Sequence, residues 1–184
     1  AATEAILLLE DSTVVNDGAI TATADDSQGI EAGNNATVTN QGGGAIQGGS
    51  GATGAAILFS GTDAAANNIV NNTGTGEITT SGTGTVAIQG SVGNETVTLS
   101  NTSTLTGDII LGGGNDIVTI QDDATATGNV DLGDGTNQFD IGGTADLTGT
   151  ITGGADVDTV TITDDSTVLG DIDLGAGANV LTIN

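Results

Sequence analysis

The sequence of 184 residues contains no lysine, arginine or histidine, although it carries 24 aspartate and glutamate residues. A chain without basic side chains cannot neutralise phosphate groups, which argues against nucleic acid and anionic membranes as partners. A net charge of −24 requires cations around the protein, either bound at defined positions or held in the ionic atmosphere. Divalent cations are therefore expected partners.

Other absences argue against catalysis. Histidine and cysteine, the commonest side-chain base and the thiol nucleophile, are missing, and no arginine or lysine could stabilise developing negative charge. Aspartate pairs such as 156 with 158, or 171 with 173, could in principle act as acid and base on a glycoside. Sugar sites usually need aromatic platforms, however, and Phe59 and Phe139 are the only aromatic residues. We expect a non-enzymatic protein.

Targeting signals are also missing. No apolar run approaches the roughly 20 residues that cross a bilayer, so no membrane insertion is expected. The chain begins at Ala1 without a signal peptide, which predicts a processed, secreted protein, although a piece of a longer chain would look the same. The lack of cysteine leaves the redox compartment open.

What the chain does have is a repeat. From residue 90 to 184 the sequence returns to the same pattern every 21 residues without insertion, as from Val97 to Val118 to Phe139. A period in the low twenties, with one supersecondary unit per copy, is typical of a solenoid. This prediction requires Val118 and Phe139 to be stacked neighbours, and it is wrong if they are not.

Aligned copies show the cross-section of one coil. Two apolar columns, Val97 to Leu181 and Leu99 to Ile183, flank a polar column, and this alternation predicts a strand with one face inward. Two further strands per coil follow in the same way, separated by glycine-rich corners such as Gly107. The fold class is therefore all-β: a single-stranded right-handed parallel β-helix of about eight coils, rising roughly 4.8 Å per coil.

Residues 1–89 repeat the pattern irregularly, so we expect one domain with irregular coils over 1–89 and regular 21-residue coils over 90–184. Loops at 42–55 and 61–67 should project from the shaft. Residues 10–15 resemble residues 164–169, which makes Ile6 and Leu8 inward residues of a first strand, like Val160 and Ile162. Both ends would then be unpaired strands without caps. The expected assembly residues are Ile6, Leu7, Leu8, Leu9, Val180, Leu181 and Ile183.

Two stretches, residues 33–42 (GNNATVTNQG) and 167–182 (TVLGDIDLGAGANVLT), resemble the passenger domains of bacterial autotransporters and related β-helical adhesins. The resemblance covers most of the chain. It implies a right-handed β-helix, export across the cell envelope, and a role at the cell surface in adhesion or assembly.

Residues 111–119 (LGGGNDIVT) are similar to the glycine-aspartate repeat of calcium-binding β-rolls. That resemblance implies calcium near Asp116, which the 21-residue period stacks between Glu95 and Asn137, with Asp158 further along. Hard oxygen ligands at one-coil spacing suit Ca²⁺. Alternating acids and amides would also relieve repulsion without a metal, as a solvated ladder. The full set of candidate metal ligands is Glu95, Asp116, Asp158, Asp122, Asp123, Asp164 and Asp165.

Two function classes remain. In the first, the protein is a structural subunit whose strand around Leu181 and Ile183 pairs with Ile6 and Leu8 of the next copy, because repeated head-to-tail contacts produce filaments. In the second, it is the shaft of an adhesin whose loops at 42–55 and 61–67 bind a surface or glycan.

Overall fold

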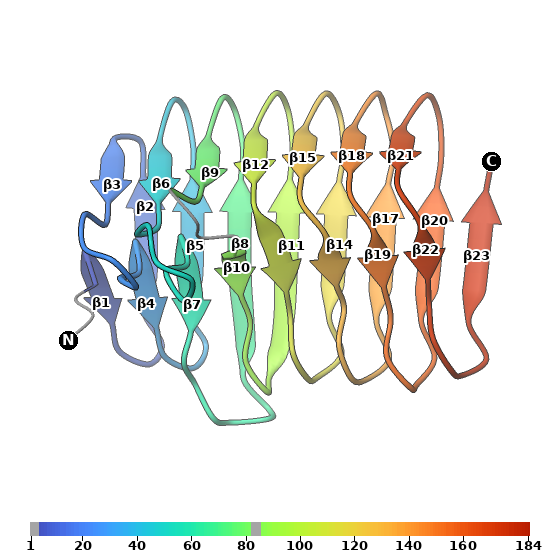
Figure 1. The fold of residues 1–184 in the computed structure, drawn as a ribbon, viewed down its shortest axis with the longest axis horizontal. Coiled ribbons are helices and arrows are strands. Elements are labelled where there is room, and N and C mark those ends of the chain that lie inside the picture. Colours follow the sequence, from blue (N-terminus) through green and yellow to red (C-terminus); the bar gives the residue numbers. More distant parts are fainter. Residues whose placement is uncertain (1–3, 82–85) are drawn as a thin grey trace.

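The computed structural model describes residues 4–81 and 86–184, and over those residues it contains strands and turns but no helix. Its 23 strands form three all-parallel sheets, which we name A, B and C. Each coil adds one strand to each sheet in turn, so strands three apart in the sequence lie side by side (Figure 1). The protein is a parallel β-helix of seven to eight coils, as the repeat predicted.

The strands have these bounds. Sheet A consists, in spatial order, of β1 (Ile6–Leu8), β4 (Ile30–Ala32), β7 (Ile57–Phe59), β10 (Val86–Gln89), β13 (Asp108–Ile110), β16 (Val130–Asp131), β19 (Ile151–Thr152) and β22 (Ile172–Asp173). Sheet B consists of β2 (Thr13–Asn16), β5 (Thr37–Asn40), β8 (Asn67–Asn72), β11 (Asn94–Leu99), β14 (Ile117–Ile120), β17 (Gln138–Ile141), β20 (Thr159–Ile162) and β23 (Val180–Ile183). Sheet C consists of β3 (Ala19–Thr21), β6 (Ala45–Gln47), β9 (Glu77–Thr79), β12 (Thr104–Thr106), β15 (Thr125–Thr127), β18 (Asp146–Thr148) and β21 (Thr167–Leu169).

In the regular coils each strand pairs with its neighbours in the register that the 21-residue period predicts. Val118 pairs with Val97 on one side and with Phe139 on the other, so the stacking on which the prediction depended is confirmed. Inward columns of valine, isoleucine and leucine run along the shaft and form one continuous core. Beta-branched residues suit this core because each packs on its equivalent in the next coil.

The predicted register of the N-terminal strand is wrong. Strand β1 pairs with β4 in sheet A, so Ile6 stacks on Ile30 and belongs to the column that ends at Ile172, not to the column that contains Val160. The inward direction of Ile6 and Leu8 was correct, since both pack against the core. The error came from the turn: the Glu-Asp-Ser-Thr corner at 10–13 leads into sheet B, whereas its look-alike at 164–167 leads into sheet C.

Both corners carry the same residue type for the same physical reason. Asp11 and Asp164 have φ of 57° and 60°, in the left-handed region that aspartate and asparagine tolerate better than most residues. Similar turn chemistry therefore appears at two different corners of the triangle. Local sequence similarity could not tell them apart.

The irregular half differs from prediction in its loops. Part of the expected 42–55 loop is strand β6 of sheet C, and the insertion itself covers only residues 48–56. Residues 60–66 form a loop as expected, and a further insertion, 22–29, was not predicted. The insertions 22–29 and 48–56 contact each other, because the Gly49 N–H donates to the Ser27 carbonyl at 2.9 Å. All three sheets nevertheless run through both halves of the chain.

Candidate functional site

The corner that precedes sheet B contains a column of polar side chains inside the solenoid. Its members, one per coil, are Asn68, Glu95, Asp116, Asn137, Asp158 and Asn179. The first five are buried, and Asn179 in the last coil is half-buried. The sequence predicted the order from Glu95 to Asn179 but not the place of Asn68, and the suggestion that these acids form a solvated ladder is wrong because Glu95, Asp116 and Asp158 are buried.

Backbone hydrogen bonds explain why the column is polar. The N–H of Glu95 donates to Oδ1 of Asp116 at 2.7 Å, and the N–H of Asp116 donates to Oδ1 of Asn137 at 2.9 Å. The N–H of Asn137 donates in turn to Oδ1 of Asp158 at 3.2 Å, and that of Asp158 to Asn179 at 2.8 Å. The four side chains from Asp116 to Asn179 thus each satisfy a corner N–H of the preceding coil that would otherwise be buried without a partner, while Glu95 accepts the side-chain amide of Asn68.

Two oxygen atoms in this column have no hydrogen-bond partner: Oε2 of Glu95 and Oδ2 of Asp116. The pKa of Asp116 is raised to about 7, mainly because burial disfavours the charged carboxylate and in smaller part because of the charge of Glu95, against the opposing effect of the hydrogen bond from the Glu95 N–H. Burial also raises the pKa of Glu95, against the opposing effect of hydrogen bonds from Asn68 and Ser91. The pair is the most perturbed ionisable group that the structure describes.

The structure does not gather the predicted metal ligands into one site. Within residues 4–81 and 86–184, no group of three or more acidic side chains is close enough to hold a metal ion. Asn137 separates Asp116 from Asp158 in the column, and Oδ2 of Asp158 accepts the N–H of Gly154 at 3.3 Å. Calcium therefore remains a prediction from sequence, without a ligand cage among these residues.

The other candidate ligands are exposed corner residues. Oδ2 of Asp122 accepts the N–H of Asn101 at 2.9 Å, and Oδ2 of Asp164 accepts the N–H of Gly143 at 3.1 Å. Asp123 accepts a hydrogen bond from the Thr144 hydroxyl. These carboxylates secure the turn of the neighbouring coil. Asp165 lies beside Asp164 and is likewise exposed.

The residues expected at the two ends differ in what they contribute. Leu7 and Leu9 are 59% and 75% exposed on the outer surface, and Ile6 and Leu8 are half-buried beneath them. At the other end Leu181 and Ile183 are 47% and 67% exposed, although they belong to inward columns whose inner members are fully buried. Val180, 49% exposed, lies on the outer face of β23.

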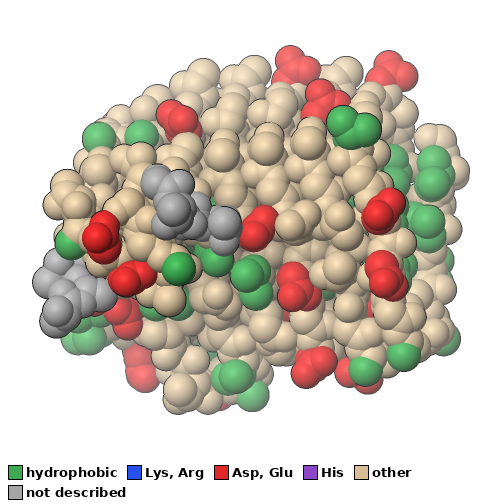
Figure 2. Space-filling model, in the orientation of Figure 1, with side chains coloured by type: hydrophobic (Ala, Val, Ile, Leu, Met, Phe, Trp, Pro, Cys, Tyr) green, Lys and Arg blue, Asp and Glu red, His purple; other side chains and the backbone are tan. Residues whose placement is uncertain are grey.

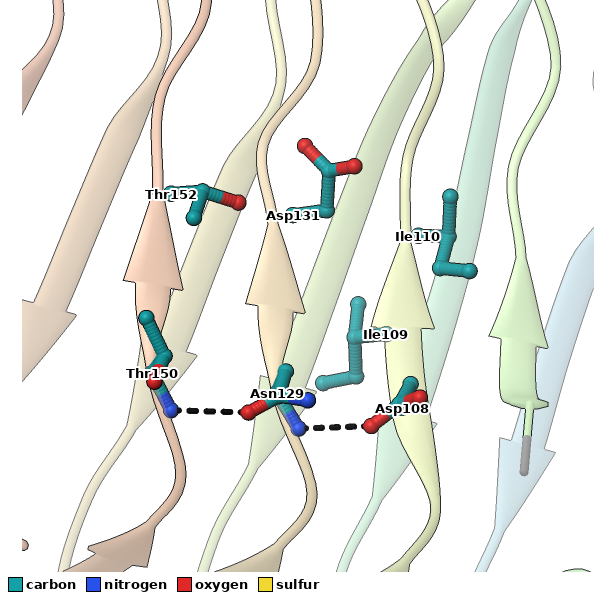
Figure 3. A pocket seen from close by; sticks show the side chains of 7 residues that line it. All are labelled: Asp108, Ile109, Ile110, Asn129, Asp131, Thr150 and Thr152. Atoms are coloured by element: carbon teal, nitrogen blue, oxygen red, sulfur yellow. Dashed lines mark hydrogen bonds between the residues drawn. The ribbon is translucent and has the colours of Figure 1, made fainter. Parts of the chain in front are cut away.

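The surface of the described residues carries several shallow hollows. One of about 310 Å³ lies on the outer face of sheet A, lined by Asp108, Ile109, Ile110, Asn129, Asp131, Thr150 and Thr152 (Figure 3). In it Oδ1 of Asp108 accepts the N–H of Asn129 at 2.7 Å, and Oδ1 of Asn129 accepts the N–H of Thr150 at 3.0 Å. These side chains are therefore already used to join coils, and no aromatic residue lies among them.

The two aspartate pairs considered for glycoside chemistry differ in their exposure. Asp158 is buried while Asp156 is exposed, so their carboxyl groups do not face one groove. Asp171 and Asp173 are both exposed, and Oδ1 of Asp173 accepts the N–H of Gly175 at 3.0 Å.

Acidic side chains are scattered over the surface seen in Figure 2, and hydrophobic ones gather along the edge where β23 lies.

Sequence reasoning missed a second buried ladder, formed by Asn16, Asn40 and Asn72 at the end of three sheet B strands. Nδ2 of Asn16 donates to Oδ1 of Asn40 at 2.8 Å, and Nδ2 of Asn40 donates to Oδ1 of Asn72 at 2.8 Å. The signal was present: asparagine stands two residues after valine in all three irregular coils. In the regular coils the same column is Leu99 and then isoleucine.

Comparison of the chain with protein-family models, with curated proteins and with solved structures finds no match. No helix in the described part of the chain is long and apolar enough to cross a membrane.

Proposed function

We propose that the protein is an extracellular, non-enzymatic structural protein whose β-solenoid subunits stack head to tail into a filament. The observation that supports this is the continuity of the core columns into uncovered end coils. Among the strands of residues 4–81 and 86–184, β1, β2 and β3 have a neighbour on one side only, and so do β21, β22 and β23 on the other side. Unpaired strand edges above an apolar core are templates for further strands.

The corrected register changes which strands would meet. Strand β22 would continue into β1 of the next copy in sheet A, and β23 into β2 in sheet B, whereas sheet C, with seven strands against eight, would lack one strand at the junction between β21 and β3. Ile172 would then pack on Ile6 of the next copy, and Leu181 on Val14, which repeats the residue types found within the shaft. Asn16 would meet Ile183.

That one polar contact already has a counterpart inside the chain. Asn72 pairs with Leu99 where the asparagine ladder ends, and Nδ2 of Asn72 is satisfied by the carbonyls of Gly76 and Thr104. Asn16 likewise donates to the carbonyls of Gly18 and Ala45, so stacking on an aliphatic residue leaves its amide bonded.

The charge of −24 opposes this assembly, because two ends without any basic residue meet. Repulsion between exposed charges falls with ionic strength, since the Debye length is about 10 Å at 0.1 M salt. We therefore expect filaments to form more readily as NaCl rises, and at lower concentrations of divalent than of monovalent salt.

Electron microscopy and sedimentation of the purified protein across protein and salt concentrations test the proposal. Ile183→Glu, which puts a carboxylate into the uncovered column, should abolish filaments. Leu169→Glu is the matched control, because Leu169 is 69% exposed against 67% for Ile183 but points outward. If both variants fold by circular dichroism and both still form filaments, end-to-end stacking through this column is wrong.

The second candidate is the shaft of a surface adhesin, which the insertions 22–29 and 48–56 favour. They meet outside the regular shaft, where Oδ1 of Asp26 accepts the N–H and the hydroxyl of Thr53 at 3.0 Å each. Ordered loops on a rigid shaft are a common position for binding residues. Persistent short rods at all salt concentrations, together with retention on a surface glycan array that is lost when 48–56 is shortened, would favour this function over the filament.

A further inference from the structure

We propose that Asp116 is a neutral carboxylic acid in the folded protein and that its O–H donates a hydrogen bond to the ionised carboxylate of Glu95 in the preceding coil. The buried Glu95–Asp116 pair then joins two coils only while this proton is present. The device is independent of filament formation, because both residues lie in the interior of the shaft.

The first argument comes from the amides in the same column. Nδ2 of Asn137 donates to the carbonyls of Gly133 and Gly135 at 3.3 and 3.2 Å, while Oδ1 accepts the N–H of the preceding coil. Nδ2 of Asn179 donates to corner carbonyls in the same way. At these two positions the corner therefore uses one acceptor and one donor of the side chain. Asp116 supplies the acceptor with Oδ1, and its Oδ2 can be a donor only if it carries a proton.

Asp158 is an acid of the same column whose two carboxyl oxygens both have a hydrogen-bond donor. Its Oδ2 accepts the N–H of Gly154 at 3.3 Å, so both of its oxygens have donors. Asp116 has no such N–H on its second oxygen. The two coils thus differ in whether the corner presents a donor to the carboxyl group.

Glu95 is suited to be the ionised partner. Its Oε1 accepts hydrogen bonds from Nδ2 of Asn68 at 2.8 Å and from the Ser91 hydroxyl at 2.7 Å. Hydrogen bonds to the charged form of a carboxylate favour that form. The remaining Oε2 is buried and unpartnered, and it can accept a hydrogen bond from the O–H of Asp116.

No other group can neutralise the pair. The chain contains no basic residue, so two buried carboxylates one coil apart would have no protein counter-charge. The nearby acids Asp63 and Asp134 lie on exposed corners, and Asp158 is separated from Asp116 by Asn137. A shared proton removes one of the two charges and satisfies both unpartnered oxygens at once.

The pH dependence has a definite sign. The folded protein retains the proton up to about pH 7, whereas an aspartate in the unfolded chain loses it near 3.8. The folded state is therefore favoured by acid, and this stabilisation is lost as the pH rises towards and through 7. Carboxyl groups with ordinary pKa values, about 4, are already ionised at pH 5.5, so a change in stability between pH 5.5 and 8 measures a group whose pKa is raised.

Urea unfolding of the whole chain between pH 5.5 and 8, followed by circular dichroism, tests the proposal. We expect the midpoint of the wild type to fall over this interval. Asp116→Asn should have a flat profile and a higher midpoint than the wild type at pH 8, because it restores the donor found in Asn137 and Asn179. Asp158→Asn is the matched control and should keep the slope of the wild type.

A second measurement does not depend on the variants. Carboxyl ¹³C spectra of aspartate-labelled protein should show one buried aspartate that titrates near 7. The proposal is overturned if Asp116→Asn keeps the pH dependence of the wild type, or if every aspartate titrates in the ordinary range. It is also overturned if Ca²⁺ raises the midpoint of the wild type at pH 8 but not that of Asp116→Asn, which would place a metal ion at this pair.

Discussion

The buried asparagine ladder makes a sharp prediction about stability. Asn40 is fully buried, and its Nδ2 donates to Asn72 at 2.8 Å and to the carbonyls of Gly44 and Glu77 at 2.9 and 3.1 Å. Its Oδ1 accepts from Asn16. Asn40→Ala removes all four bonds and leaves the buried Oδ1 of Asn72 without a donor.

The magnitude follows from these contacts. A typical hydrogen bond contributes about 1 kcal/mol net, and a buried acceptor left unpaired costs about 1–3 kcal/mol. Gly44 and Asn16 keep other partners, so only part of the loss is felt. We expect Asn40→Ala to lower the free energy of unfolding by about 2–4 kcal/mol. With a urea slope of about 2–3 kcal/mol per molar, the midpoint should fall by roughly 1 M.

The control is Thr39→Ala, one residue earlier on the outer face of the same strand β5, which should change stability by less than about 0.5 kcal/mol. Urea unfolding must be followed by circular dichroism, because the chain has no tryptophan or tyrosine. If the midpoints of the two variants agree within error, the ladder does not contribute to stability as argued. A larger loss for Asn40→Asp at pH 7, partly reversed in acid, would support it further, since the new oxygen would face three acceptors.

Two further predictions concern the regular coils. Gly135→Ala should cost more than about 2 kcal/mol, because Gly135 has φ of 117° and a Cβ there would lie 1.7 Å from the Gly114 carbonyl oxygen. Gly113→Ala, whose Cβ would meet nothing closer than 4.0 Å, should cost less than about 0.5 kcal/mol, and equal thermal midpoints would refute the corner geometry. Phe139→Ala should cost about 3–5 kcal/mol and Phe139→Leu under about 1.5 kcal/mol, since leucine occupies the same column at Leu181. Chemical denaturation in which the alanine variant matches the leucine variant would contradict the tight packing of that column.

The sequence alone determined the architecture of the regular half. An uninterrupted 21-residue period places every residue over its equivalent, so the pairing of Val118 with Phe139 and the order of Glu95, Asp116 and Asn137 could be predicted. The reason is that a parallel solenoid has almost no freedom of register once coil length is constant. A slip of one residue would turn the apolar columns outward.

Only the tertiary structure decided the register of the first strand and the environment of the corner acids. Asp11 and Asp164 adopt the same backbone conformation at different corners, so the turn sequence could not identify which sheet begins at Ile6. Whether a corner carboxyl is solvated depends on whether its side chain lies inside the solenoid or on its surface. Asp116 is buried in the same column as Glu95, whereas Asp122 is exposed, although both lie at glycine-rich or polar turns of similar composition.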